Sequence, residues 1–172
     1  MMTIFNFQFS IFNFGRQRGF TLIELMVVLS VTAVLGTLGV AGFINYNQVQ
    51  VLQSSANDVA TMLNLAKSRS QSQIKPTSLC PTQSLDGYKL IIAADSEGKY
   101  RKYTLYIRCS GADIKVSQQD KTLPSDLTFS SYPSFLFPVV KGGVQTADQV
   151  VISGYGRSKT IIVNSLGGVN IQ

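Results

Sequence analysis

The sequence contains no histidine, no tryptophan and only two cysteines among its 172 residues. Without histidine there is no Ser-His or Cys-His pair to activate a nucleophile. The usual zinc sites are excluded as well, because two cysteines cannot form a cysteine-rich site and no histidine completes one. We therefore expect a protein that is not an enzyme and that holds no metal or other cofactor.

Charge is nearly absent from one long stretch near the N-terminus. Between Phe20 and Ile44 the only charged residue is Glu24. A helix of this length covers roughly 37 Å, more than the roughly 30 Å apolar core of a bilayer. Arg16 and Arg18 precede the stretch, and the next basic residue lies far downstream. This asymmetry predicts a single membrane span with a cytoplasmic N-terminus and an extracytoplasmic remainder.

Glu24 is the unusual feature of this span. A carboxylate inside an apolar span is costly and is by default a functional site. The alternative is a plain anchor in which Glu24 lies near the lipid headgroups.

The residues around Glu24 distinguish these two interpretations. The run Arg-Gly-Phe-Thr-Leu-Ile-Glu-Leu-Met-Val-Val-Leu at 18–29 closely resembles the processing site of type IV pilins and type II secretion pseudopilins. In that family a prepilin peptidase cuts after the glycine, and the new N-terminus is methylated. The resemblance implies cleavage between Gly19 and Phe20, N-methylation of Phe20 and a role for Glu24 in filament assembly.

The resemblance also makes residues 1–19 a cleaved prepilin leader. Prepilin leaders are usually short and basic, whereas this segment is apolar and aromatic ahead of Arg16. Either the leader is long, or the true start differs from Met1. In both cases the segment is not expected to be part of the folded domain.

After the span at 20–44, the helix is expected to continue in amphipathic form over 45–75. Apolar residues recur there at steps of four and three, which marks one face of a helix. They are Leu52, Ala56, Val59, Leu63 and Ala66. Pro76 lacks a backbone N–H and restricts the residue before it, so we expect the helix to end at Lys75.

The remaining part, 76–172, has the pattern of a globular β domain. Short β-prone runs alternate with turn residues. The expected strands are 77–80, 88–92, 103–107, 114–117, 127–130, 135–137, 149–152, 160–163 and 169–171. One long helix followed by eight or nine short strands predicts an α+β fold, with the helix packed on an antiparallel sheet.

This layout is similar to the GspH/FimT type of minor pseudopilins and minor pilins. The similarity rests on Ala-Lys-Ser-Arg-Ser at 66–70 leading to Cys80, on Phe137-Pro138 before Gly142-Gly143, and on a final strand pair within 160–172. It implies a structural subunit of a type II secretion pseudopilus or a type IV pilus. The implied partners are prepilin peptidase, other pilin or pseudopilin subunits and the inner-membrane assembly platform. The implied location is the inner membrane and then the filament.

Two alternatives stay open: a major pilin subunit, and a FimT-like minor pilin that binds DNA for uptake. Without the two leader arginines the side chains sum to 13 basic minus 9 acidic, or +4, a mild excess. DNA-binding members of the FimT type resemble one another in a Gly-Arg-x-Arg segment near the C-terminus. The corresponding place, 167–170, has no arginine. Arg157 and Lys159 echo the motif in an earlier turn and are the candidate DNA contacts, but we expect nucleic-acid binding to be weak or absent.

The two cysteines, Cys80 and Cys109, each close an expected strand. An extracytoplasmic domain permits a disulfide, and adjacent strand ends would bring the two residues within reach. We expect the disulfide, and the alternative is a pair of free buried thiols.

Overall fold

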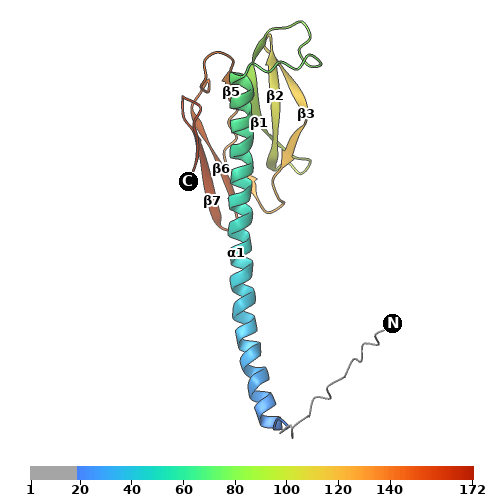
Figure 1. The fold of residues 1–172 in the computed structure, drawn as a ribbon, viewed down its shortest axis with the longest axis vertical. Coiled ribbons are helices and arrows are strands. Elements are labelled where there is room, and N and C mark those ends of the chain that lie inside the picture. The colour runs from blue at the N-terminus through green and yellow to red at the C-terminus, as the bar shows by residue number, and fades with distance from the viewer. Residues whose placement is uncertain (1–18) are drawn as a thin grey trace, which may run out of the picture. The chain divides into compact units, whose positions relative to one another are not determined.

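A computed structural model describes residues 19–172; the predicted leader therefore lies almost wholly outside the described residues. The chain divides into two units, one ending at Phe43 and the other spanning Ile44–Gln172. One helix, α1 (Leu22–Gln71), runs through both (Figure 1).

Helix α1 begins at a capped N-terminus. The Thr21 hydroxyl accepts a hydrogen bond from the Glu24 N–H at 3.3 Å, and the Thr21 carbonyl accepts one from the Leu25 N–H at 3.2 Å. A threonine in this position satisfies one of the free N–H groups that every helix start exposes. The first turn of α1 is therefore fixed by the sequence just after the predicted cleavage point.

The first unit contains the apolar part of α1. Its hydroxyl groups bond back to the helix: those of Ser30, Thr32 and Thr37 donate to carbonyls three or four residues earlier, at 2.8–3.0 Å. Polar side chains satisfied in this way are compatible with an apolar surrounding. By length and composition α1 could cross a membrane, with a mean hydropathy of 2.2 over its most apolar 18 residues.

The second half of α1 buries one face in the domain core. The buried apolar residues of this face are Leu52, Ala56, Val59, Ala60, Met62, Leu63 and Ala66. They include every residue of the apolar stripe predicted from the sequence. The amphipathic pattern over this part of the helix is thus confirmed.

The helix ends at Gln71, earlier than the predicted end at Lys75. Gln73 takes a positive φ of 49°, and the N–H of Ile74 bonds to the carbonyl of Arg69 at 3.1 Å. The N–H of Gln73 bonds to the carbonyl of Ser70 at 3.1 Å. This pair of bonds is a Schellman motif, which closes the helix before Pro76 can act.

In the described part of the chain, residues 19–172, eight strands form two antiparallel four-stranded sheets. The first has the order β3-β2-β1-β5 and the second β4-β6-β7-β8. In chain order the strands are β1 (Leu85–Ala94), β2 (Tyr100–Cys109), β3 (Ala112–Thr122), β4 (Thr128–Phe129), β5 (Phe135–Pro138), β6 (Asp148–Gly154), β7 (Arg157–Val163) and β8 (Val169–Ile171). Each coincides with an expected strand.

The prediction of a ninth strand, at 77–80, is wrong. The carbonyl of Pro76 accepts the N–H groups of Leu79 and Cys80, at 3.1 and 3.0 Å. These bonds close a turn, and the β-prone residues there find no partner strand.

Both sheets contribute side chains to the core that covers α1. The largest fully buried side chains include Tyr88, Phe135 and Phe137 in the first sheet and Ile152 and Ile161 in the second. The result is a long N-terminal helix packed on antiparallel sheets, which confirms the predicted α+β class.

Two long-range bonds attach the end of the helix to the first sheet. The buried Ser70 hydroxyl donates to the Phe137 carbonyl at 2.7 Å, and the Tyr88 hydroxyl donates to the Ile74 carbonyl at 2.7 Å. Gly87 permits the close approach of β1 and β5, since a Cβ there would lie 2.3 Å from the Phe137 carbonyl oxygen. Burial raises the pKa of Tyr88, so its hydroxyl remains a donor at neutral pH.

Candidate functional site

The predicted cleavage point lies just outside helix α1. Gly19 and Phe20 have no helical or strand structure, and both are exposed. The Phe20 side chain is 78% exposed, and a Cβ added at Gly19 would meet nothing within 4 Å. Among the described residues, nothing shields the Gly19–Phe20 bond from an approaching enzyme.

Glu24 occupies the first turn of α1 and is exposed. Its negative charge suits the positive end of the helix dipole. Within residues 19–172, no lysine or arginine lies within 4.0 Å of its carboxylate to form an ion pair. The carboxylate is therefore available to a cation outside this part of the chain.

Thr21 is a structural residue that the sequence interpretation missed. Thr21-x-x-Glu24 has the spacing of a capping box, in which a threonine cap is followed three residues later by glutamate. The structure shows the half of that box in which the threonine hydroxyl accepts the Glu24 N–H. The Thr21-x-x-Glu24 spacing was the signal in the sequence that could have predicted this helix cap.

An extended apolar surface surrounds this site. The exposed large apolar side chains of the first unit are Phe20, Leu22, Ile23, Leu25, Met26, Val27, Val28, Leu29, Val31, Val34, Leu35, Val40 and Phe43. Soluble monomers seldom expose so large a contiguous apolar patch. The surface is suited to lipid or to the apolar helices of other subunits.

The two cysteines meet between the end of the helix and the first sheet. The structure joins Cys80 to Cys109 with their Cα atoms 6.1 Å apart, within the range that a disulfide spans. Cys80 follows the turn after α1, and Cys109 ends β2. Both residues are buried. A bond here would fix the chain leaving the helix to a central strand of the first sheet.

The disulfide gives a prediction for stability. Cys80 and Cys109 are 29 residues apart in the sequence. In the chain-entropy model, closing a loop of this size stabilises by about 3–4 kcal/mol. Replacing both cysteines with alanine should lower the free energy of unfolding by about that amount, measured by denaturant titration. Thiol labelling of the denatured, unreduced protein provides the direct measurement, and two labels per chain would rule the bridge out.

The candidate DNA contacts lie at the start of β7, after a tight turn. Tyr155 and Gly156 have φ of 54° and 70°, the signature of a two-residue hairpin turn between β6 and β7. The Arg157 guanidinium donates to Asn45 Oδ1 at 2.9 Å. Arg157 and Lys159 point to the same face of the sheet, because side chains alternate along a strand. The structure thus places Arg157 against helix α1.

The acidic turn between β1 and β2 serves the fold. The Asp95 carboxylate accepts the N–H groups of Glu97 and Lys99 at 2.8 and 3.0 Å and pairs with the Arg101 guanidinium. Burial alone would raise the pKa of the Asp95 carboxyl, but these donors outweigh it and hold the pKa below its ordinary value. Over residues 19–172, no three potential metal-ligating side chains come together.

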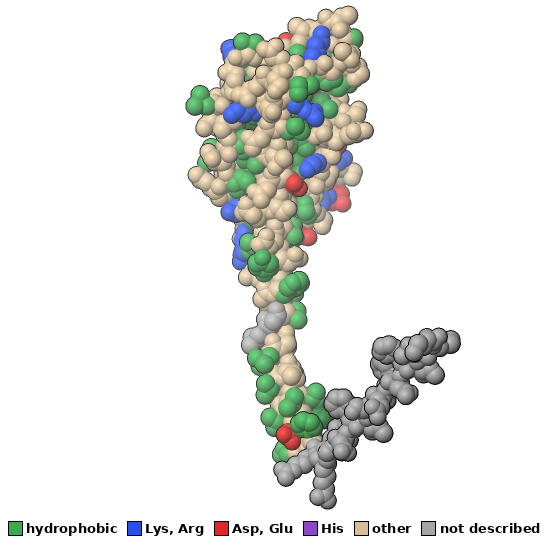
Figure 2. Space-filling view, in the orientation of Figure 1, with side chains coloured by type: hydrophobic (Ala, Val, Ile, Leu, Met, Phe, Trp, Pro, Cys, Tyr) green, Lys and Arg blue, Asp and Glu red, His purple; other side chains and the backbone are tan. Residues whose placement is uncertain are grey.

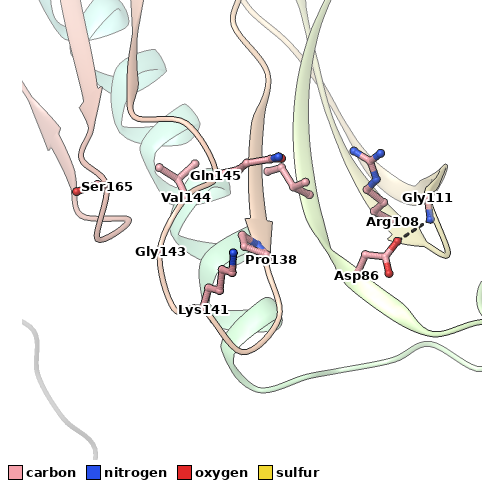
Figure 3. A pocket seen from close by; sticks show the side chains of 10 residues that line it. Asp86, Arg108, Gly111, Pro138, Lys141, Gly143, Val144, Gln145 and Ser165 are labelled. Atoms are coloured by element: carbon pink, nitrogen blue, oxygen red, sulfur yellow. Dashed lines mark hydrogen bonds between the residues drawn. The ribbon is translucent and has the colours of Figure 1, made fainter.

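A cavity of about 550 Å³ lies beside β5 and the loop that follows it (Figure 3). Arg108 and Asp86 face it from one side, and Lys141 and Gln145 from the other. Asp86 already accepts the Gly111 N–H at 2.6 Å. The cavity therefore mixes both signs of charge, and its Asp86 carboxylate is already bonded to the backbone.

Comparison with known proteins identifies the N-terminal segment. Residues 15–40 match the family model of the prokaryotic N-terminal methylation motif. The crystal structure of the type IV minor pilin FimU of Pseudomonas aeruginosa PAO1 is similar over 70% of this chain and 92% of that chain, with 18% identity and a TM-score of 0.49. No curated protein matches the sequence.

Proposed function

We propose that the chain is a minor pseudopilin or minor pilin of the GspH/FimT type, a structural subunit of a type II secretion pseudopilus or a type IV pilus. One observation carries the proposal. The methylation motif at 15–40 covers the predicted cleavage point and the first part of an exposed apolar helix, and the second half of the same helix α1 packs into the core of a folded domain. A plain membrane anchor would not need the motif.

In this proposal the first step is hydrolysis of the amide bond between Gly19 and Phe20 by prepilin peptidase. The reaction consumes one water and leaves a carboxylate on Gly19 and an amine on Phe20. The amine then takes a methyl group from a sulfonium-type methyl donor, which leaves as the thioether, and loses a proton. The exposed, non-helical geometry of the two residues supports this step. Leu22 and the residues after it stay helical throughout, because Thr21 caps the helix downstream of the cut.

The second step is transfer of the subunit from the inner membrane into the filament. The apolar part of α1 would exchange lipid contacts for contacts with the same part of other subunits. Helices in apolar surroundings associate through close packing and through polar pairs. Glu24 is the charged group in the described part of this surface, and it is the residue that we assign to assembly.

A DNA-uptake role receives less support than a purely structural one. The earlier turn, Gly156–Lys159, has lysine where the FimT-type pattern has its second arginine. Asn164 accepts the N–H groups of Gly167 and Gly168 in the turn where the FimT-type arginines would be expected. That turn carries no basic residue.

Mass spectrometry of the membrane-bound protein tests the proposal. We expect a chain that begins at Phe20 and carries one methyl group on its amine. The protein should also co-purify with the other filament subunits of the same cell. A membrane-bound chain that still carries Arg16 and Arg18 would contradict the proposal.

A further inference from the structure

The hairpin between β6 and β7 lies next to the point where the apolar span ends. Ile44 is the last residue of that span, and Asn45 is the first polar residue after it. Arg157, two residues beyond the hairpin turn, donates to Asn45 Oδ1 at 2.9 Å. Both residues belong to the second unit, so this relation does not depend on how the two units are arranged. The depth of Asn45 therefore sets the depth of the hairpin.

The hairpin carries positive charge that the domain does not neutralise. No carboxylate within residues 19–172 lies within 4.0 Å of Arg157 or Lys159. Asp126 is the neighbouring acid, and it accepts a hydrogen bond from the Tyr155 hydroxyl at 3.2 Å. Figure 2 shows lysine and arginine side chains at the lower end of the domain, beside the helix. An arginine has five N–H donors, so Arg157 keeps several after bonding to Asn45.

Aromatic residues accompany these cations. Tyr46, one residue after Asn45, is 63% exposed. Tyr155 forms the hairpin turn, packs against the domain core and bonds to Asp126. Tyrosine is enriched where a membrane protein crosses the headgroup region, because its ring is apolar and its hydroxyl is polar. An exposed tyrosine next to Asn45, with the unpaired Arg157 charge bonded to Asn45, is a combination expected at a membrane surface.

We infer that the β6–β7 hairpin docks onto lipid phosphates of the outer leaflet before the subunit enters the filament. The inference rests on the proposed function, because it requires that residues 20–44 span the membrane. Arg157 would bind a headgroup phosphate through its remaining donors, and Lys159 would add a second positive charge. Arginine is well suited to this role because its planar fork matches the phosphate oxygens. Docking would hold the hairpin at the headgroups, and assembly would release it.

The absence of tryptophan from the chain makes a direct test possible. Ser158→Trp places a single reporter in the hairpin of the full-length protein. The protein is reconstituted into bilayers of phosphatidylcholine with and without phosphatidylglycerol, and quenching by lipids brominated close to the headgroup is measured. We expect quenching that increases with the anionic lipid and falls with salt. Each cation near an anionic surface contributes up to about fivefold, so removing both should reduce docking up to about thirtyfold.

Matched variants identify the contact. On the Ser158→Trp background, Arg157→Gln with Lys159→Gln should lose the quenching that depends on phosphatidylglycerol. Lys75→Gln with Lys141→Gln removes the same charge from two exposed positions elsewhere in the domain and should have no effect. Arg157→Lys keeps the charge and should retain most of the quenching. Equal loss in Arg157→Lys, or loss in the Lys75 and Lys141 pair, would overturn the phosphate contact.

A second reporter separates this inference from the proposed function. Val34→Trp reports on the span and should be quenched by bromines deep in the acyl chains. Quenching there without quenching at Ser158→Trp would overturn the docking inference and leave the membrane subunit intact. A Val34→Trp reporter that is not quenched would overturn both.

Duplex DNA offered in place of lipid is the last arm: tight binding lost in the Arg157 and Lys159 double variant would make the hairpin a nucleic-acid surface and overturn the lipid assignment.

Discussion

Replacing Gly19 with leucine should leave nearly all of the protein as uncleaved precursor. The peptidase must accommodate a small residue at the cut, and a branched side chain there would collide with the enzyme. The chain itself tolerates the change, because a Cβ at Gly19 meets nothing within 4 Å and the helix cap begins at Thr21. Loss of cleavage in this variant would therefore report on recognition by the enzyme and not on misfolding.

Intact-mass measurement of the membrane fraction detects the precursor directly, since the leader adds residues 1–19 to the mass. Gly19→Ala is the matched control, because it adds one methyl group to the same position and should still be cut, although more slowly. The thermal melt of the domain should be the same in both variants and in the wild type. Normal processing of Gly19→Leu would contradict cleavage at this bond.

The sequence was sufficient for features that depend on local patterns. The apolar stripe of α1 repeats every three to four residues, and Leu52, Ala56 and Leu63 are buried as that spacing requires. The β6–β7 turn was visible because Gly156 permits the positive φ that a two-residue hairpin needs. These features are decided by residues close together in the chain.

Other features depend on partners that the sequence does not place. Thr77–Cys80 has β-prone residues, but the Pro76 carbonyl accepts the N–H groups of Leu79 and Cys80 and closes a turn instead. The helix ends at Gln71 because Gln73 adopts a left-handed conformation, which is uncommon for a residue other than glycine.

Long-range pairing had no local signal either. The pairing of β5 with β1, which brings Phe137 opposite Tyr88, joins segments that are far apart in the sequence. The bond between Arg157 and Asn45 links residues 112 positions apart, and no local pattern predicts it. The sequence alone would leave Arg157 as an unbonded cation of a candidate DNA motif. The bond to Asn45 instead holds it beside the end of the predicted span.

The other large effect is expected at Glu24, where the structure shows an exposed carboxylate without a cationic partner among residues 19–172. Cleavage after Gly19 creates a positive amine on Phe20, about one helical turn away. Inside a bundle of apolar helices, opposite charges a few ångströms apart attract far more strongly than in water. The amine and the carboxylate, within one chain or between neighbours, can therefore hold a new subunit in register.

Removing the carboxylate should abolish or strongly weaken assembly while the subunit still folds. Glu24→Ala leaves the Phe20 amine buried without its partner, which costs about 3–5 kcal/mol for buried pairs. The core of the domain, from Leu52 onward, contains neither group, so its melting temperature should not change. Cleavage at Gly19 should also proceed, because Glu24 lies inside the helix and the cut lies outside it. Cross-linking or co-purification with the other filament subunits measures assembly.

Asp58→Ala is the matched control, since Asp58 is an exposed acid on the same helix whose ion pair with Lys121 is long, at 3.8 Å, and open to solvent. Exposed pairs of this kind contribute about 0–1 kcal/mol, so this variant should be processed and should assemble normally. If Glu24→Ala also assembles normally, Glu24 is an interfacial residue of an anchor, as in the simpler interpretation of the span. If Glu24→Ala lowers the melting temperature of the domain, its role lies in folding and not in the filament. Glu24 and Asp58 both belong to α1, but Glu24 lies in the predicted apolar span and Asp58 lies in the folded domain. Comparing the two variants therefore separates the effect of a charge within the span from that of a charge on the domain.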